Sequence, residues 1–482
     1  MRALSTTAPL AAAPPVALPG ALPGALPGAV RPAAHSPRTL ALLQAPILRT
    51  LLRLAGPNVL VMLAQSSTGL IEAHFVGRLG TPALAGMALV FPGIMLMQMM
   101  SSGAMGGGIS SAIARALGAG RRGDADILAL HAMAISLGLG LLFCAAGLLA
   151  GPALYRAMGG EGAALAAALQ YSNVVFGGAV LVWGFNGLAS CIRGTGDMLA
   201  PALVICGGAL VLVPLSPCLI FGWGPFPALG VAGGGVALLL YYAVGGAVLA
   251  AYLCSARAGV RLRLHRLRWG PLWAILRVGL LASLVSLQTN LVVTLTTAFA
   301  GGFGAAAIAG YGAGSRLEFL RVPLVFGLGA PLVALVGTNL GAGQRERALR
   351  VAWVGAGVAF LMTQAIGLAG AMWPAAWLGL FGQDPAMLAA GATYLRATGP
   401  FFGFFGGGMA LYFASQGAGR LAWPLAAAVL RMAVAVGGGW LALRLTGSLQ
   451  AVFLALGAGL LALGVVNAAA IAGGAWFRRD AA

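Results

Sequence analysis

Residues 57–77 read PNVLVMLAQSSTGLIEAHFVG, an apolar stretch long enough to cross a membrane as a helix. About 20 apolar residues span the roughly 30 Å of hydrocarbon in a bilayer. Similar blocks recur along the whole chain, which is 60% hydrophobic and only 8% charged. A soluble protein of 482 residues exposes a large share of them to water and could not bury so much apolar surface. The sequence therefore predicts an all-α polytopic membrane protein.

The apolar blocks predict twelve transmembrane spans, at about residues 57–77, 84–107, 128–150, 168–190, 200–222, 229–254, 277–300, 306–335, 351–373, 388–413, 422–444 and 449–473. Every basic residue is an arginine, and arginines concentrate in every second connection between spans. Because positive connections stay on the cytoplasmic side, we expect a multi-pass protein of the cytoplasmic (inner) membrane with both termini in the cytoplasm. The net charge of +19 then reflects topology, and no nucleic-acid partner is expected.

The two halves of the chain repeat one another. Phe75, Gly80 and Gly86 recur as Phe299, Gly304 and Gly310, and the run at 117–120 (LGAG) recurs at 340–343. Matches at nearly one offset across several spans indicate an internal duplication. Six spans per copy is an even number, so the copies share one orientation, as in the parallel repeats of secondary transporters. We expect two pseudo-symmetric six-helix bundles that alternate access to the two sides of the membrane.

The repeat suggests five regions of the chain. They are a disordered low-complexity tail (1–36), an N-terminal lobe that starts with an amphipathic segment (37–254), a basic cytoplasmic linker (255–272), a C-terminal lobe (273–475) and a cytoplasmic tail (476–482). The amphipathic stretch 38–55 is expected on the inner membrane surface.

The sequence gives no support for a nucleotide-binding or metal-binding site. The run at 118–123, GAGRRG, fits the dinucleotide pattern GxGxxG, but it follows a membrane span instead of a β-strand. The five cysteines contain no CxxC pair, so no metal site or disulfide framework is expected. Without a Walker motif, energy must come from an ion gradient. We expect no cofactor, with H⁺ or Na⁺ as the coupling ion.

Several segments together resemble the multidrug and toxic compound extrusion (MATE) family of cation-coupled antiporters. The segments are GLIEAHFVGRLGTPALAG, IARALGAGRRGDA, LASCIRGTGDMLAPAL, LIFGWGPFPALGVAGGGVA, VGTNLGAGQRERAL and ASQGAGRLAWPLA, within about residues 50–475. The resemblance implies twelve helices in two lobes, and export of amphipathic, often cationic compounds in exchange for protons or sodium. Family members carry an ion-coupling aspartate in helix 1, where this chain has Glu72. A second aspartate, before a proline in helix 5, is replaced by Ser216, which argues against a sodium site of that kind.

Only two of the nine acidic residues, Glu72 and Glu318, lie within predicted spans. A charge near the bilayer centre costs at least about 2.5–3.5 kcal/mol, so such residues are functional candidates by default. Glu72 has no arginine nearby, and a carboxyl removed from water without a cationic partner can load and release a proton. The plainer interpretation is that it reaches headgroup water. Glu318 is followed by Arg321 on the same helix face, so an ion pair is its plainer role.

The ion-coupling candidates are therefore Glu72 and Glu318, with His74 as a residue that could tune Glu72 from another helix face. Polar residues within spans are candidates for the substrate cavity; these are Gln65, Gln98, Asn173, Asn186, Gln288 and Asn290. Interhelical hydrogen bonding is the plainer role for most of them. Gln65 and Gln288 occupy matching repeat positions and are expected to line opposite walls.

The predicted function is a secondary antiporter that exports small amphipathic or cationic molecules and works as a monomer in the bilayer. A flippase of a lipid-linked precursor is the alternative, but its diphosphate would require several cationic residues that the first lobe does not offer at mid-depth. An intramembrane enzyme would need paired aspartates or a Ser/His pair, and neither pattern is found, so the chain is not predicted to be an enzyme.

Overall fold

The computed structural model describes residues 35–263 and 265–477, and the side chains of Leu70, Ala256, Glu318 and Phe319 fall outside that description. The predicted tail 1–36 therefore lies outside the described residues except for its last two, as does most of the C-terminal tail. Within the described ranges every regular element is a helix.

The first lobe, called the N-lobe below, is built from the helices that follow a short helix α1 (Pro37–Gln44). They are α2 (Ile47–Gly77), α3 (Thr81–Gln98), the π-helical η1 (Met99–Met105), α4 (Gly106–Gly118), α5 (Arg122–Ala157), α6 (Gly162–Gly177), α7 (Ala179–Gly194), α8 (Leu199–Phe221) and α9 (Val231–Cys254). The predicted amphipathic stretch 38–55 is divided at Ala45 and Pro46, and its second part belongs to α2. A single-turn helix, η2 (Ala256–Ala258), begins the linker.

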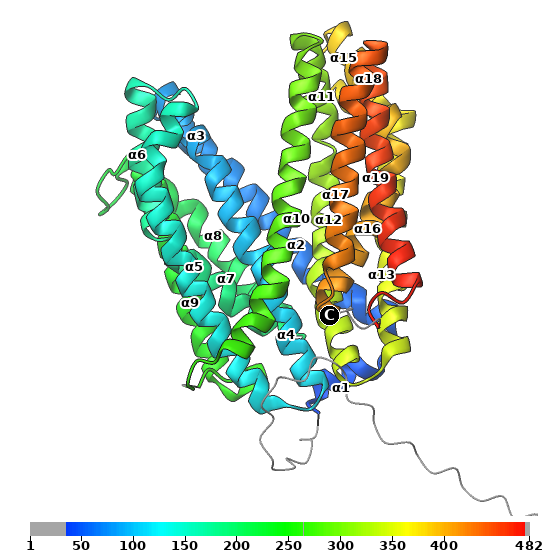
Figure 1. Ribbon diagram of the computed structural model, residues 1–482. Coiled ribbons are helices and arrows are strands. Elements are labelled where there is room, and N and C mark those ends of the chain that lie inside the picture. Colours follow the sequence, from blue (N-terminus) through cyan, green and yellow to red (C-terminus); the bar gives the residue numbers. More distant parts are fainter. Residues whose placement is uncertain (1–34, 264, 478–482) are drawn as a thin grey trace, which may run out of the picture.

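The second lobe, the C-lobe, contains α10 (Trp269–Gly301), α11 (Ala305–Ser315), α12 (Glu318–Gly341), α13 (Arg345–Met372), α14 (Pro374–Leu378), α15 (Pro385–Thr398), η3 (Gly399–Phe401), α16 (Phe402–Ala418), α17 (Ala422–Met432), η4 (Ala433–Gly437), α18 (Gly438–Thr446) and α19 (Leu449–Ala472). Figure 1 shows the two lobes packed together at the end where α1 lies, and splayed apart at the other. We call these the closed end and the splayed end.

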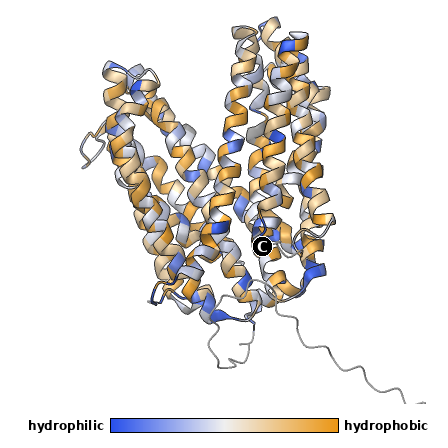
Figure 2. Cartoon of the chain, viewed as in Figure 1, coloured by the Kyte–Doolittle hydropathy of each residue, from blue (hydrophilic) through white to orange (hydrophobic). Residues whose placement is uncertain are grey.

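Length and hydropathy agree with a membrane-spanning protein. Ten of the described helices are long and apolar enough to cross a bilayer, and α6 with α7 makes an eleventh span if this pair, bent by 46°, is counted as one. The remaining predicted span, 388–413, is divided by η3 into two helices that are each shorter than a bilayer requires. Apolar residues run along most of the helix surfaces, with hydrophilic residues at the closed end and some part-way along the helices (Figure 2). The twelve predicted spans are consistent with this architecture.

The internal repeat is visible in the backbone. Gly80 and Gly304 both have positive φ, 110° and 96°, immediately before the second helix of their lobe. Gly120 and Gly343 both close the turn after the LGAG helices, with φ of 73° and 77°. Residues with a side chain rarely adopt these angles, so glycine is required at each matched position.

The lobes meet where α4 crosses α12. A Cβ added to Gly118 of α4 would collide with the backbone of Thr338, and one added to Gly341 of α12 would collide with the backbone of Arg115. Gly118 and Gly341 are equivalent residues of the two LGAG runs, so each of the two crossing helices contributes the same glycine to the contact. Small residues allow such close approach of membrane helices. The GxGxxG pattern therefore has a packing role.

The first long helix of each lobe begins in the core of the other lobe. Leu51 and Ala55, near the start of α2, are buried in the core of the C-lobe. In the opposite direction, Ile275 near the start of α10 is buried in the core of the N-lobe. Both helices therefore start at the closed end in the partner lobe and continue into their own (Figure 1).

Candidate substrate and ion-coupling site

Glu72 lies in the last two turns of α2 and is half-buried. Its Oε1 accepts a hydrogen bond of 2.9 Å from the hydroxyl of Tyr171 on α6. A Cβ added to Gly234 on α9 would stand 2.9 Å from the same oxygen, so the carboxylate fits against bare backbone there. Three helices of the N-lobe thus meet at one carboxyl group.

His74 does not join this arrangement. Its side chain is exposed, and its ring meets that of Phe75 edge to face with 5.8 Å between centroids. Residues two positions apart on a helix point to different faces, which explains the separation from Glu72. The structure therefore brings Glu72 together with a tyrosine that our sequence analysis did not single out as a site residue, although Tyr171 matches Tyr394 in the repeat.

Two predicted cavity residues, Gln98 and Asn186, belong to a second polar group in the N-lobe. Asn186 Nδ2 on α7 donates to Gln98 Oε1 at 3.1 Å and to Ser101 Oγ at 2.8 Å. Gln98 Nε2 in turn donates to the hydroxyl of Tyr242 on α9. Buried Asn186 and half-buried Gln98 thus bond to one another across helices, which is the interhelical bonding that polar residues in membrane helices commonly provide.

The other predicted cavity residues are dispersed. Asn173 on α6 is exposed, and so is Gln65 on α2. Gln288 on α10 is buried, and neither its amide nitrogen nor its amide oxygen has a hydrogen-bond partner among the described residues. Gln65 and Gln288, which were expected to line opposite walls, therefore lie in different environments. Asn290 is exposed and donates to Ser286 O at 3.0 Å, one turn back on α10.

The interior of the C-lobe contains two buried arginines. The guanidinium of Arg321 on α12 lies between the rings of Phe402 and Phe405, 4.3 Å and 4.2 Å from their centroids. Arg431 on α17 lies 5.4 Å from the Phe405 ring, and both arginines are more than nine-tenths buried. Cation–π contact of this kind stabilises a desolvated guanidinium. The predicted pairing of Glu318 with Arg321 concerns a side chain outside the described residues.

The repeat shows that the carboxyl site exists in one lobe only. Glu72 corresponds to Thr296 at the offset of 224 that relates Phe75 to Phe299. Thr296 is buried, and its hydroxyl donates to Val292 O at 2.8 Å within its own helix. At this repeat position the N-lobe therefore carries a carboxyl group, whereas the C-lobe carries a hydroxyl that donates to the backbone of its own helix.

Hydrogen bonds hold the lobes together at the closed end. Gln416 Nε2 on α16 donates to the carbonyl oxygens of Gly103 and Ala104 at 3.4 Å and 3.2 Å. Arg115 Nη1 donates to Gly417 O at 2.9 Å. Asn58, in the first half of α2, donates to Gly327 O of α12 at 3.1 Å. We call these contacts the inter-lobe seam.

Comparisons with known proteins agree with this architecture. The family model described as MatE matches residues 57–218 and 282–441, which include parts of both lobes. Among curated relatives, an FAD transporter of Shewanella oneidensis is 30% identical over 316 residues, covering 64% of this chain and 68% of the relative. A probable multidrug resistance protein NorM of Thermotoga maritima is 27% identical over 352 residues, covering 72% and 74%.

Solved structures of MATE transporters superpose on both lobes. A MOP-superfamily transporter from Pyrococcus furiosus has a TM-score of 0.83 at 25% identity, and the match covers 92% of this chain and 100% of that one. A MATE transporter in its outward-facing conformation has a TM-score of 0.82 at 25% identity, over 92% and 99%. The match to a family of membrane transporters also excludes an enzyme. This chain belongs to the MatE family of multidrug and toxic compound extrusion transporters.

Proposed function

We propose that this protein exports amphipathic, often cationic, small molecules across the cytoplasmic membrane in exchange for protons, by alternating access. The observation that carries the proposal is the position of Glu72 on α2, hydrogen-bonded to Tyr171 and close to the backbone of Gly234. No other carboxylate lies within a predicted span of the N-lobe.

Protonation of Glu72 changes what its surroundings must supply. The neutral acid needs few partners and is tolerated in a dry lobe, whereas the ionised form needs water or hydrogen-bond donors to offset a cost of at least about 2.5–3.5 kcal/mol. Tyr171 supplies one donor. A change of a few kcal/mol is enough to shift a two-state equilibrium when the two states bind the proton unequally.

The helix that carries Glu72 also takes part in the inter-lobe seam. Asn58 on α2 donates to Gly327 O on the C-lobe, and the 14 residues between Asn58 and Glu72 span about 21 Å of helix. A displacement of α2 at Glu72 is thereby coupled to contacts that hold the closed end. Protonation at one end of α2 and release of the seam at the other form one conformational step.

Protons are favoured over sodium because the site offers one carboxylate. Ser216, which stands where related proteins carry a second acid, is buried and contributes a hydroxyl only. Sodium binds several oxygen ligands, whereas a proton needs a single carboxylate that can be exposed in turn to each side.

Purified protein in liposomes tests the proposal directly. A pH gradient without sodium should drive movement of a fluorescent cation such as ethidium, and a sodium gradient at fixed pH should not. Transport driven only by sodium would replace protons as the coupling ion, and no ethidium transport under either gradient would contradict the proposed substrate class.

A second substrate class follows from the C-lobe. Arg321 and Arg431 share the ring of Phe405, and Glu318 is the only acidic residue in a C-lobe span, so the interior keeps a net positive charge even if Glu318 is ionised. Guanidinium and aromatic groups together suit a planar aromatic anion. The relative from Shewanella oneidensis is described as an FAD transporter. Replacing ethidium by FAD in the same liposomes decides between the two classes.

A further inference from the structure

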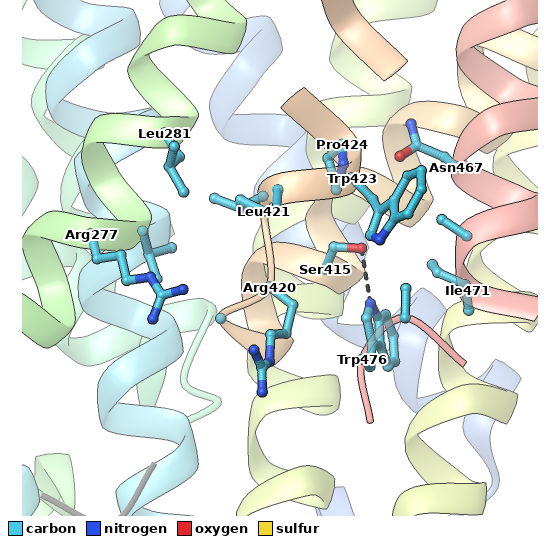
Figure 3. A pocket seen from close by; sticks show the side chains of 15 residues that line it. Arg277, Leu281, Ser415, Arg420, Leu421, Trp423, Pro424, Asn467, Ile471 and Trp476 are labelled. Carbon is cyan, nitrogen blue, oxygen red and sulfur yellow. Dashed lines mark hydrogen bonds between the residues drawn. The ribbon is translucent and has the colours of Figure 1, made fainter. Parts of the chain in front are cut away.

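A pocket of about 190 Å³ lies at the closed end of the C-lobe, between α10, the connection from α16 to α17, and the end of α19. Figure 3 shows Arg277 and Arg420 beside this space, with Trp423, Asn467 and Trp476 around it. The pocket takes no part in the carboxyl site of the N-lobe.

Two arginines line the pocket, and its lining includes no acidic residue among the described side chains. Its inner wall is rigid, because Trp476 Nε1 donates to Ser415 Oγ at 3.1 Å and both side chains are buried. Asn467, also buried, presents a further amide to the wall. The pocket therefore combines fixed polar groups with two guanidinium groups near its mouth.

The surroundings place this pocket at the depth of lipid headgroups. Arg277 is exposed although it lies within the apolar helix α10, one turn beyond Trp273. Trp273 stacks on Trp269 with 6.1 Å between ring centroids, and both rings are exposed. Trp423 at the rim of the pocket is 52% exposed. Tryptophan is enriched at the boundary between headgroups and hydrocarbon, so the three indoles mark that boundary here.

We propose that this pocket binds the phosphate of an anionic phospholipid headgroup. Guanidinium groups bind phosphate oxygens through charge-assisted hydrogen bonds, and basic pockets between membrane helices are typical sites for anionic lipids. Arg277 and Arg420 approach the phosphate from α10 and from the connection before α17. The indole of Trp423 and the side chain of Leu281 pack beside the glycerol and the first acyl carbons.

A lipid in this pocket lies next to the inter-lobe seam. Two turns of α10 around Arg277 contact the N-lobe, since a Cβ added to Gly108 of α4 would stand 2.9 Å from Ile275 O and 3.1 Å from the nitrogen of Gly279. Bridging α10 to α17 holds α10 in the position that these contacts require. A ligand that binds one conformation better than another stabilises it, so anionic lipid favours the state that is closed at this end.

Lipid binding to purified full-length protein in a neutral detergent tests the proposal without any ion gradient, so its outcome is separate from that of the transport proposal. Phosphatidylglycerol, phosphatidylcholine and inorganic phosphate are titrated separately, with native mass spectrometry and the unfolding midpoint as readouts. We expect wild-type protein to bind phosphatidylglycerol at least about tenfold more tightly than phosphatidylcholine. Equal binding of the two lipids, or equal stabilisation by inorganic phosphate alone, overturns the proposal.

The matched variants locate the site. Replacing both Arg277 and Arg420 by Gln should abolish most of the preference for phosphatidylglycerol. The control is Arg444→Gln, because Arg444 also lies beside a tryptophan, 5.6 Å from the Trp440 ring, at the end of α18. An unchanged preference in the double variant, or an equal loss in the control, contradicts the assignment. If the double variant does not fold, Trp423→Ala should weaken lipid binding in the same assay, and no weakening counts against the site.

Discussion

The hydroxyl of Tyr171 on α6 donates a hydrogen bond of 2.9 Å to Oε1 of Glu72 on α2. This contact joins the helix that reaches into the partner lobe at the closed end to a helix that stays within the N-lobe. A carboxylate removed from water depends on such donors. The contact therefore ties the position of α2 to that of α6.

Replacing Tyr171 by Phe removes this donor and little volume. Without it the ionised carboxyl loses a hydrogen bond worth about 1.5–3 kcal/mol, so dye efflux driven by a pH gradient should fall by about tenfold. The initial rate of dye efflux in liposomes measures the loss. Tyr412→Phe is the control, because Tyr412 lies on α16 of the C-lobe, where its ring packs against Phe413. An equal loss of rate in both variants would show that the tyrosines act only through packing.

Replacing Gly234 by Ala should displace the Glu72 carboxylate, since the new methyl group would lie 2.9 Å from Oε1. The carboxyl is the end of a flexible side chain and would move away, which breaks its hydrogen bond from Tyr171, so we expect coupled transport to fall by about tenfold. Gly246→Ala on the same helix is the control, because no atom lies within 4 Å of its added Cβ. Full transport activity in Gly234→Ala would mean that the carboxylate does not depend on this contact.

Replacing Gln416 by Ala removes two hydrogen bonds from the inter-lobe seam. Each lost hydrogen bond is worth about 0.5–1.5 kcal/mol, so the closed end should separate more often. Spin labels at Gly123 and Arg350, on opposite lobes, report this as a second, longer distance in electron resonance measurements. Gln364→Ala is the control, because Gln364 accepts from Gly403 N within the C-lobe alone. A distance distribution identical to that of wild type would exclude Gln416 from the gate.

The arginine pattern predicts that the linker and both termini are cytoplasmic. A cysteine at Arg266, introduced into a background without the five native cysteines, should resist a membrane-impermeant maleimide added to intact cells. A cysteine at Leu380, which is 74% exposed in the connection after α14, should be labelled. Labelling of position 266 from outside would invert the topology.

The fold was predictable because its main signals are local or periodic. Apolar runs of bilayer length are sufficient to predict the spans, and the duplicated LGAG run predicted two matching lobes. The sequence also predicted Glu72 as a candidate, because a carboxylate is costly inside an apolar run. Its role in coupling stays a prediction.

The contacts of the site were not predictable, because they depend on how helices bend and cross. The bend between α6 and α7 lies inside a continuous apolar run, where nothing in the hydropathy marks it. Nothing in its local sequence marks Tyr171 as a site residue, and its contact with Glu72 follows from tertiary packing.

Gln65 and Gln288 show the limit of the repeat. They match at an offset of 223, whereas the offset of 224 that relates Phe75 to Phe299 along the same helices pairs Gln65 with Thr289. Gln65 is exposed and Gln288 is buried.

The central claim is that Glu72 couples protons to transport, and the variant Glu72→Gln tests it most directly. Glutamine keeps the shape of the protonated acid but cannot release a proton, so folding and substrate binding should persist, whereas Glu72→Asp should retain partial activity. The measurement is dye efflux driven by a pH gradient in liposomes containing purified Glu72→Gln, with substrate binding measured on the same preparation. We predict normal binding with no efflux driven by the gradient. Efflux at the wild-type rate would contradict the account.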